Sequence, residues 1–460
     1  MEYTITFLQR EYERLTTALF DGASTERGAY LLCRLSRTTS ETRLLVREII
    51  PVELEDVLDA SADHMTVHSR SYLRPMKRAD EHGEAFVFVH SHPAGYSHHS
   101  QQDDIEEEAL FRTAYTRIHA DVVHASLVMS NPDRPVGRVW LPDGSIRPIK
   151  RTRVVGDRLQ VFQESIKDAV IPTHLDRQVR AFGAATQRIL SELTIGLVGA
   201  GGTGSAVFEQ LVRLGVGRII VADPELFESS NVNRVYGSRL SDAGSPKVWL
   251  AERTASEIGV GTSVTVIGAS ITFASVLQQF RDCDVIFGCT DDEWGRSLLT
   301  RFAIIYCIPV FDMGVEIDSE NGVINTIQGR VTTLIPTRAC LHCRQRIAAH
   351  RVRAETMQAL NPEQALALRA EGYAPELVDP SPAVIPFTTT VAASAITELL
   401  HRLTGFLGAE RRSSEVMHFF SNTRVRTNDR AATADCFCGQ EHNWGLGDVE
   451  PFLDMTWRPE

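Results

Sequence analysis

The sequence predicts an α/β protein with two domains: an α+β unit over residues 1–155, and a doubly wound parallel sheet with covering helices over residues 177–440. The 460 residues suffice for two or three domains, and 43% hydrophobic and 23% charged residues are typical of globular proteins. Short apolar runs alternating with polar turns indicate the first unit, and a strand, glycine turn, helix, strand order indicates the second. Residues 156–176 are expected to be a linker and residues 441–460 a C-terminal tail.

The first unit is expected to contain helices near residues 5–20 and 104–118, where apolar residues recur with helical periodicity. The charged stretch from Arg151 to Arg180, which Pro172 interrupts, is interpreted as a connector. The expected strands of this unit are the apolar runs Tyr30–Leu35, Leu44–Ile50, Phe86–Val89, Ala125–Met129 and Val136–Leu141.

In the second unit, the expected strand Leu193–Val198 is followed by a glycine turn, the helix Ser205–Leu214 and the strand Arg218–Ala222. Later strands are expected at Val285–Gly288 and Ile308–Phe311, because both runs are short and apolar.

The composition excludes several function classes. Lys and Arg number 47 and Asp and Glu number 59, and the net charge of −12 disfavours nucleic acid or an anionic membrane as a partner. The first residues lack the apolar stretch of a signal peptide, and no window has the roughly 18 apolar residues of a membrane span, so a cytoplasmic protein is expected. Eight cysteines, four of them in two close pairs, favour a reducing compartment and a metal clip.

Two histidines end an apolar strand of the first unit. In the segment 85–93, AFVFVHSHP, His90 and His92 are two residues apart and therefore lie on one face, where both imidazoles can bind one ion. Asp103 follows at the start of an acidic helical segment and can supply a third ligand, which leaves one position of a zinc ion open for water. Three ligands plus water describe a hydrolytic zinc site, and Glu26 is the candidate base.

The spacing His-x-His, seven residues, Ser, two residues and Asp, with an upstream Glu, resembles the JAMM/MPN metallopeptidases, which cleave bonds after the C-terminal glycine of ubiquitin-like proteins. The resemblance covers the first unit. The nearby His98 and His99 are interpreted as loop residues. The resemblance implies that His90, His92 and Asp103 bind a catalytic zinc, that Glu26 deprotonates the water and that Ser100 stabilises the oxyanion.

A glycine-rich turn of the second unit follows a strand and opens a helix, so that its backbone can approach a phosphate. Its glycines are Gly199, Gly201, Gly202 and Gly204, and Asp223 at the end of the next strand can bind ribose hydroxyls. NAD-binding proteins share both features. A triphosphate site is favoured by the polar residues that follow, which can bind phosphates and magnesium: Asn231, Asn233, Arg234, Lys247 and Asp291.

In this order, the residues resemble the ThiF/MoeB and ubiquitin-activating family, which adenylates the C-terminal glycine of a β-grasp protein. The run DPELFESSNVNR, followed thirteen residues later by Lys247, carries the resemblance. Arg177 matches an arginine that family members often insert into the neighbouring subunit's site, so a homodimer is expected. The resemblance implies ATP and Mg as cofactors, with Asp223 on the ribose, Asn231, Arg234 and Lys247 on the phosphates and Asp291 on the magnesium.

The cysteine pairs match the family's structural zinc site of four thiolates, Cys340, Cys343, Cys436 and Cys438, although the second pair is Cys-x-Cys. Family members that form a thioester carry a cysteine in the segment that crosses over the nucleotide, and this chain has none between Arg344 and Leu400. The reaction is expected to stop at the acyl-adenylate, to pass it to a partner's nucleophile, or to form an oxyester on Ser381 or on Thr388 to Thr390.

The two resemblances together imply a bacterial ubiquitin-like conjugation protein, of a kind that in some cases serves antiviral defence. It would trim a ubiquitin-like β-grasp protein to its C-terminal glycine, or detach it from targets, and adenylate that glycine for an E2-like transfer enzyme. One alternative is processing and activation of a sulfur carrier protein for cofactor, cysteine or siderophore biosynthesis, with a sulfur-transfer partner. Another is a non-catalytic dimeric scaffold that binds a ubiquitin-like protein.

Overall fold

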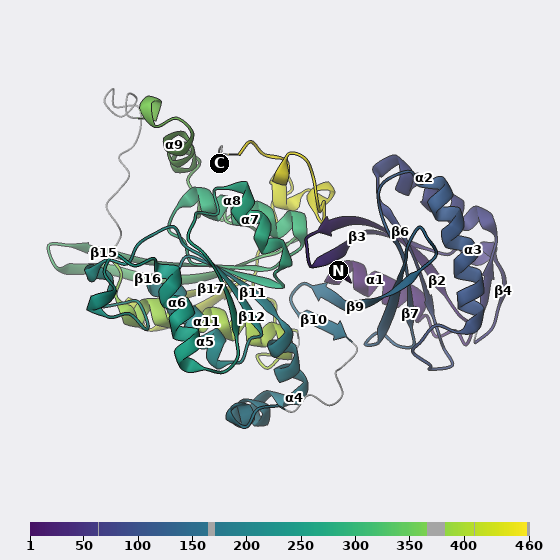
Figure 1. Ribbon diagram of the computed structural model, residues 1–460, viewed down its shortest axis with the longest axis horizontal. Helices are drawn as coiled ribbons and strands as arrows, with labels where there is room; N and C mark the ends of the chain where they lie inside the picture. The colour runs from purple at the N-terminus through teal and green to yellow at the C-terminus, as the bar shows by residue number, and fades with distance from the viewer. Residues whose placement is uncertain (63, 164–170, 366–381, 409, 458–460) are drawn as a thin grey trace. The chain divides into compact units, whose positions relative to one another are not determined.

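The computed structural model describes residues 1–62, 64–163, 171–365, 382–408 and 410–457 (Figure 1). The chain divides into two compact units. Unit 1 comprises Met1–Asp168 and Trp444–Val449, and unit 2 comprises Ala169–Asn443 and Glu450–Glu460. Among the described helices, none is both long and apolar enough to cross a membrane.

Unit 1 is built on a sheet that closes on itself. The strand order is β1-β3-β2-β6-β7-β8-β9-β10, and β1 also pairs with β9, so seven of the strands form a barrel. The bounds are β1 (Glu2–Leu8), β2 (Gly28–Arg37), β3 (Glu41–Pro51), β6 (Ala85–Ser91), β7 (His124–Met129), β8 (Pro135–Trp140), β9 (Ile146–Val155) and β10 (Leu159–Gln163).

Alternation along the strands separates two cores. In β6, Ala85, Val87 and Val89 belong to the cluster that also holds the apolar face of α1 (Gln9–Leu19). Phe86 faces the opposite way and packs in a second cluster with α2 (Ser69–His82) and α3 (Gln101–Arg117), which run beside the barrel strands in Figure 1. A short hairpin of β4 (Val57–Ala60) and β5 (Met65–Val67) completes the unit.

Three expectations for this unit need correction. The helix expected from residue 5 begins at Gln9, because residues 2–8 pair with both β3 and β9 as a strand. The connector expected from Arg151, and the linker over residues 156–176, contain strands of this sheet, since β9 runs to Val155 and β10 pairs with it. Within the expected tail, residues 444–449 belong to unit 1, where the backbone nitrogen of Asp448 donates to Leu35 O at 2.8 Å.

Unit 2 contains a second eight-stranded sheet in the order β13-β12-β11-β14-β15-β16-β17-β18. The first five strands are parallel and the last three are antiparallel, and the order reverses between β11 and β14. The bounds are β11 (Thr194–Val198), β12 (Arg218–Ala222), β13 (Ser263–Ile267), β14 (Val285–Gly288), β15 (Val310–Glu320), β16 (Val323–Leu334), β17 (Glu415–Phe419) and β18 (Arg424–Asn428).

The parallel part of this sheet confirms the predicted Rossmann-like arrangement. Ligands of such sheets bind outside the carboxyl ends of the strands where the order reverses, which here lies between β11 and β14. The helices are α4 (Asp176–Glu192), α5 (Gly202–Arg213), α6 (Lys247–Ile258), α7 (Ala274–Gln278), α8 (Glu293–Tyr306), α9 (Ala349–Leu360) and α11 (Ile385–Thr404).

Candidate functional site

The histidine cluster of unit 1 lies where β6 ends and α3 begins. His90 is opposite Gly28 in the ladder of β2 and β6, and the backbone nitrogen of His92 donates to Met129 O at 2.9 Å, which fixes the end of the strand. Ser100 caps α3: its Oγ accepts from the Asp103 backbone nitrogen at 3.1 Å, and the Asp103 carboxylate accepts from the Ser100 nitrogen at 2.6 Å. The capping box holds Asp103 in the first turn, beside the histidines.

The side chains predicted to bind zinc converge. The Nε2 atoms of His90 and His92 are 3.0 Å apart, and the Asp103 carboxylate lies 3.2 Å from His90 Nε2 and 3.5 Å from His92 Nε2. Glu26 Oε1 lies 3.5 Å from His92 Nε2. All four residues are buried, so each polar group needs a partner within the cluster or its surroundings.

The donor set fits a zinc ion. His92 Nδ1 lies 3.2 Å from Tyr96 O, and because a carbonyl can only accept, the proton is on Nδ1 and the Nε2 lone pair faces the cluster. The carboxylate oxygen Glu26 Oε1 is buried and has no hydrogen-bond partner within the described residues. Two imidazoles and a carboxylate beside an unpartnered glutamate are the groups of a hydrolytic zinc site.

The electrostatics follow from burial and from the mutual proximity of these groups. Burial raises the pKa of Glu26 to about 7, although His90 and His92 oppose the shift. Burial would lower the pKa of His90, but the carboxylates of Asp103, Glu26 and Glu107 outweigh it and raise that pKa. Burial would raise the pKa of Asp103, but the two histidines hold it well below its usual range.

Two features beside this cluster were not predicted. His99 lies in a loop, as expected, but its side chain is largely buried and its Nε2 lies 3.1 Å from Ser126 Oγ. Glu107, one turn beyond Asp103 on α3, is buried and accepts hydrogen bonds from three side chains. The i, i+4 spacing from Asp103 was a signal for Glu107, because residues four apart share a helix face.

The glycine turn of unit 2 lies at the carboxyl end of β11. Gly199 has φ of +92°, and a Cβ on Gly204 would lie 1.9 Å from Gly199 O, so the tight turn requires glycine at both positions. A Cβ on Gly201 would meet nothing within 4 Å, whereas Gly202 lies beneath the aliphatic part of the Arg234 side chain. The turn therefore presents backbone to solvent at Gly201, at the N-terminus of α5.

Asp223 ties this turn to the end of β12. Its carboxylate accepts from the backbone nitrogens of Ala200 at 2.6 Å and Glu225 at 2.8 Å, and burial raises its pKa while those two hydrogen bonds oppose the shift. Each carboxylate oxygen has two lone pairs, so both oxygens can still accept a ribose hydroxyl.

The cations predicted to bind phosphates have different surroundings. Lys247, at the start of α6, is buried and forms an ion pair with Glu225, a partner that was not predicted. Arg234 is partly buried, and its guanidinium donates to Ser230 O at 3.0 Å. Asn231 is buried and its side-chain oxygen accepts from the Glu228 nitrogen at 3.3 Å, so in this structure Asn231 holds its own turn.

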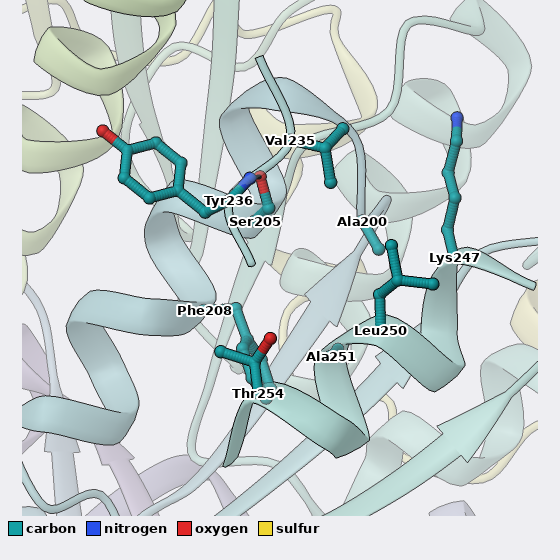
Figure 2. A pocket seen from close by; sticks show the side chains of 9 residues that line it. All are labelled: Ala200, Ser205, Phe208, Val235, Tyr236, Lys247, Leu250, Ala251 and Thr254. Carbon is teal, nitrogen blue, oxygen red and sulfur yellow. Dashed lines mark hydrogen bonds between the residues drawn. The ribbon is translucent and has the colours of Figure 1, made fainter. Parts of the chain in front are cut away.

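A small pocket opens beside the glycine turn (Figure 2). The Lys247 side chain extends away from its apolar floor, and Tyr236 points away on another side, where its hydroxyl lies 2.9 Å from Thr389 Oγ1. The residues that line the pocket are Ala200, Ser205, Phe208, Val235, Tyr236, Lys247, Leu250, Ala251 and Thr254.

The two acidic residues after β14 differ in their roles. Asp292 caps α8, because its carboxylate accepts from the Gly295 nitrogen at 2.5 Å and from the Thr290 hydroxyl. Asp291 is exposed and has no hydrogen-bond or ion-pair partner in the described parts of the chain, so its carboxylate is available to a cation. Arg177 is exposed in the first turn of α4.

The four predicted cysteine ligands come together. Sulfur distances are 3.6 Å between Cys340 and Cys436 and 3.4 Å between Cys343 and Cys438, far longer than a disulfide. Thiolates around a tetrahedral zinc ion are about 3.8 Å apart, so the cluster fits zinc despite the Cys-x-Cys pair. The Thr433 nitrogen donates to Cys343 Sγ at 3.5 Å.

The hydroxyls considered for an oxyester are engaged. Thr388 donates to Ile385 O at 3.0 Å and Thr390 to Pro386 O at 2.7 Å, both within α11, and Thr389 contacts Tyr236. Ser381 lies outside the described residues.

A model of the ThiF family matches residues 175–439. The SAMP-activating enzyme E1 of Haloferax volcanii is 29% identical over 156 residues, 34% of this chain and 54% of that protein. The sulfur carrier protein ThiS adenylyltransferase of Bacillus subtilis is 30% identical over 164 residues, 35% of this chain and 46% of that protein. The ubiquitin-like modifier-activating enzyme 5 of Drosophila persimilis is 27% identical over 167 residues, 34% of this chain and 42% of that protein.

The chain thus spans about half the length of these curated relatives. Among solved structures, the chain is similar to E. coli MccB with MccA-N7isoASN, at a TM-score of 0.47 and 14% identity, over 58% of this chain and 75% of that one. The family model covers more than half of the sequence, and the chain therefore belongs to the ThiF family.

Proposed function

We propose that unit 2 transfers AMP from ATP to the C-terminal carboxylate of a small ubiquitin-like or sulfur carrier protein. The observation that carries the proposal is the convergence, at the carboxyl ends of the parallel strands, of the glycine turn with Asp223, Arg234 and Lys247 inside the matched ThiF region. Curated relatives of this region are named for activating SAMP, the ThiS sulfur carrier and ubiquitin-like modifiers.

The proposed step is an attack of a carboxylate oxygen on the α-phosphorus of ATP. A new P–O bond forms, the bond to the bridging oxygen of the β-phosphate breaks, and pyrophosphate leaves with the electron pair. The exposed backbone at Gly201 and the N-terminus of α5 receive phosphate oxygens, and Arg234 and Lys247 neutralise the charge that moves to the leaving group. Asp291 holds the magnesium that accompanies the nucleotide.

We further propose that unit 1 is a JAMM/MPN-type zinc peptidase that acts on the same protein, either before activation or on its conjugates. A zinc ion held by His90, His92 and Asp103 would supply polarisation of the scissile carbonyl and a more acidic water. Glu26 would take a proton from that water and deliver it to the leaving nitrogen. Ser100 Oγ accepts one backbone hydrogen bond, so its own proton is available to the oxyanion.

The proposed partners differ between two pathways. Relatives that activate SAMP or ubiquitin-like modifiers favour conjugation through an E2-like transfer enzyme, and the ThiS adenylyltransferase favours sulfur transfer. In both, Arg177 would reach the nucleotide site of a second copy, and the tetracysteine cluster would hold a structural zinc. The absence of a cysteine between Arg344 and Leu400 favours handing the adenylate directly to a partner.

The test is intact-mass spectrometry of the small β-grasp protein encoded beside this gene, incubated with the chain, zinc and Mg·ATP. Loss of residues beyond the terminal glycine, followed by a gain of the mass of AMP, is the expected result. A carrier that already ends in glycine separates the activities: if it too fails to gain AMP, the adenylation proposal is wrong, whereas a missing trim alone refutes the peptidase proposal.

A further inference from the structure

A buried carboxylate lies directly behind the histidine cluster of unit 1. Glu107 is only 1% exposed and is one turn beyond Asp103 on α3. Its Oε2 accepts three hydrogen bonds, from Ser126 Oγ at 2.5 Å, Arg138 Nε at 2.9 Å and Trp140 Nε1 at 2.9 Å. These donors come from β7 and β8, so all three of these hydrogen bonds between α3 and the barrel strands end on Oε2.

The second oxygen of Glu107, Oε1, takes no part in these hydrogen bonds. Glu107 Oε1 is buried and has no hydrogen-bond partner within the described chain, and the nearby His99 Nε2 is 3.7 Å away, too far for a hydrogen bond. His90 Nδ1 is also buried and unpartnered in the same part of the structure. Buried polar atoms of this kind are almost always satisfied, by protein or by ordered water.

Glu107 and His90 lie on the same side of the sheet. Ser126, which donates to Glu107, is opposite Phe88 in the ladder of β6 and β7, and His90 is two residues beyond Phe88 and therefore on the same face. A carboxylate oxygen can only accept, and the outer nitrogen of a histidine that ligates a metal almost always donates to a carboxylate, a carbonyl or water. Glu107 Oε1 can therefore accept the hydrogen bond that His90 Nδ1 can donate.

We propose that Glu107 is a positioning residue of the zinc site, accepting the Nδ1 proton of His90 through a bridging water and thereby directing the His90 Nε2 lone pair to the metal. This proposal rests on the zinc site proposed for unit 1. It makes the two histidines equivalent: Tyr96 O sets the tautomer of His92 and Glu107 sets that of His90. His99 takes no part as a ligand through Nε2, because Ser126 gives its proton to Glu107 and so accepts from His99 Nε2.

The variant that tests the proposal is Glu107→Gln in the full-length chain. It keeps the shape of the side chain and removes the charge that favours the Nδ1 proton on His90. The matched control is Glu108→Gln, which removes an exposed charge from the same helix and affects only the pair with Arg112. The first measurement is zinc affinity by chelator competition, with the tetracysteine zinc of unit 2 as an internal reference for zinc loading.

We expect Glu107→Gln to lower the affinity of the histidine site for zinc by about 10- to 100-fold, while Glu108→Gln and the tetracysteine site are unchanged. Equal affinities for Glu107→Gln and wild type would overturn the proposal. If the wild-type chain binds only the tetracysteine zinc, the zinc site of unit 1 is itself wrong, and the role of Glu107 falls with it.

A second measurement does not depend on whether the variant folds. In wild-type protein labelled with ¹⁵N-histidine and loaded with zinc, with His90 assigned by its loss in His90→Ala, we expect His90 to carry its proton on Nδ1. A His90 that carries no proton on Nδ1 would overturn the proposal, whatever the zinc affinities.

Discussion

The tight approach of Gly204 to Gly199 predicts how the nucleotide turn responds to a single methyl group. A Cβ on Gly204 would lie 1.9 Å from Gly199 O and 2.8 Å from its carbonyl carbon. Carbon and oxygen atoms approach to about 3.3 Å at closest, so in Gly204→Ala the start of α5 must move by about 1.4 Å. A misplacement of about 1 Å in a site can already cost about 100-fold in rate, so a shift of this size disturbs the backbone that binds phosphate.

The magnitude has two parts. Overpacking costs about 1–3 kcal/mol, and alanine returns up to about 1 kcal/mol inside a helix, so we expect a net loss near 1–2 kcal/mol and a melting temperature lower by about 2–6 °C. The displaced amides would weaken Mg·ATP binding by about 100-fold. Calorimetry measures both effects, as thermal unfolding and as the Mg·ATP dissociation constant.

Gly201→Ala is the matched comparison. Its Cβ meets nothing within 4 Å, and its φ of −73° is open to alanine, so the melting temperature is expected to stay unchanged. Mg·ATP binding should still weaken, by about 10-fold, because the methyl group covers backbone that the phosphates approach. If Gly204→Ala keeps both the wild-type melting temperature and the wild-type affinity, the turn does not bind the nucleotide as argued.

Four further predictions concern single groups. Glu26→Gln should keep zinc bound, measured by metal analysis, and slow carrier trimming by at least about 100-fold; undiminished trimming would exclude Glu26 as the base. Lys247→Met should weaken Mg·ATP binding by about 10- to 100-fold in calorimetry, and unchanged binding would place the phosphates elsewhere. Cys436→Ser should remove one zinc per chain and lower the melting temperature, whereas an unchanged zinc count would refute the tetracysteine site. Burial raises the pKa of Glu41, but Arg153 outweighs burial and holds that pKa below its ordinary 4.5, so ionised Glu41 stabilises unit 1 above that pH and less as the pH falls. In urea unfolding, the loss of unfolding free energy in Glu41→Gln should therefore shrink from pH 7 to pH 3, and a loss that stays constant would contradict this.

The sequence predicted those parts of the sites that depend on local spacing. His90 and His92 share a face because two residues span one repeat of a strand, and the glycine turn follows from residues that are adjacent in the chain. Four of the five parallel strands of unit 2 were predicted for the same reason, since each contains a short apolar run beside a turn, whereas β13 (Ser263–Ile267), which is only partly buried, was missed. Glu26 was the candidate base of the predicted zinc site, and the family resemblance supported its placement beside the histidines.

Contacts between distant residues were beyond the sequence. Glu107 meets Arg138 and Trp140, 31 and 33 residues later, through the pairing of strands that no local pattern specifies. The end of the strand at residues 2–8 was assigned to the helix expected near residues 5–20, because a short apolar run fits both periods. Its pairing with β9, near residue 150, closes the barrel and could be recognised only in three dimensions.

The chemistry of the two proposed activities fixes their order on one substrate. A carrier protein with residues beyond its terminal glycine presents an amide at that glycine, and an amide has no carboxylate to attack the α-phosphorus of ATP. Hydrolysis in unit 1 would create the carboxylate that unit 2 would consume, and adenylation of that glycine cannot precede it. The same hydrolysis on a conjugate returns a carrier with a free carboxylate, so both uses of the peptidase deliver the substrate of the adenylation site, and a carrier that gains AMP before it loses its extension would contradict the scheme.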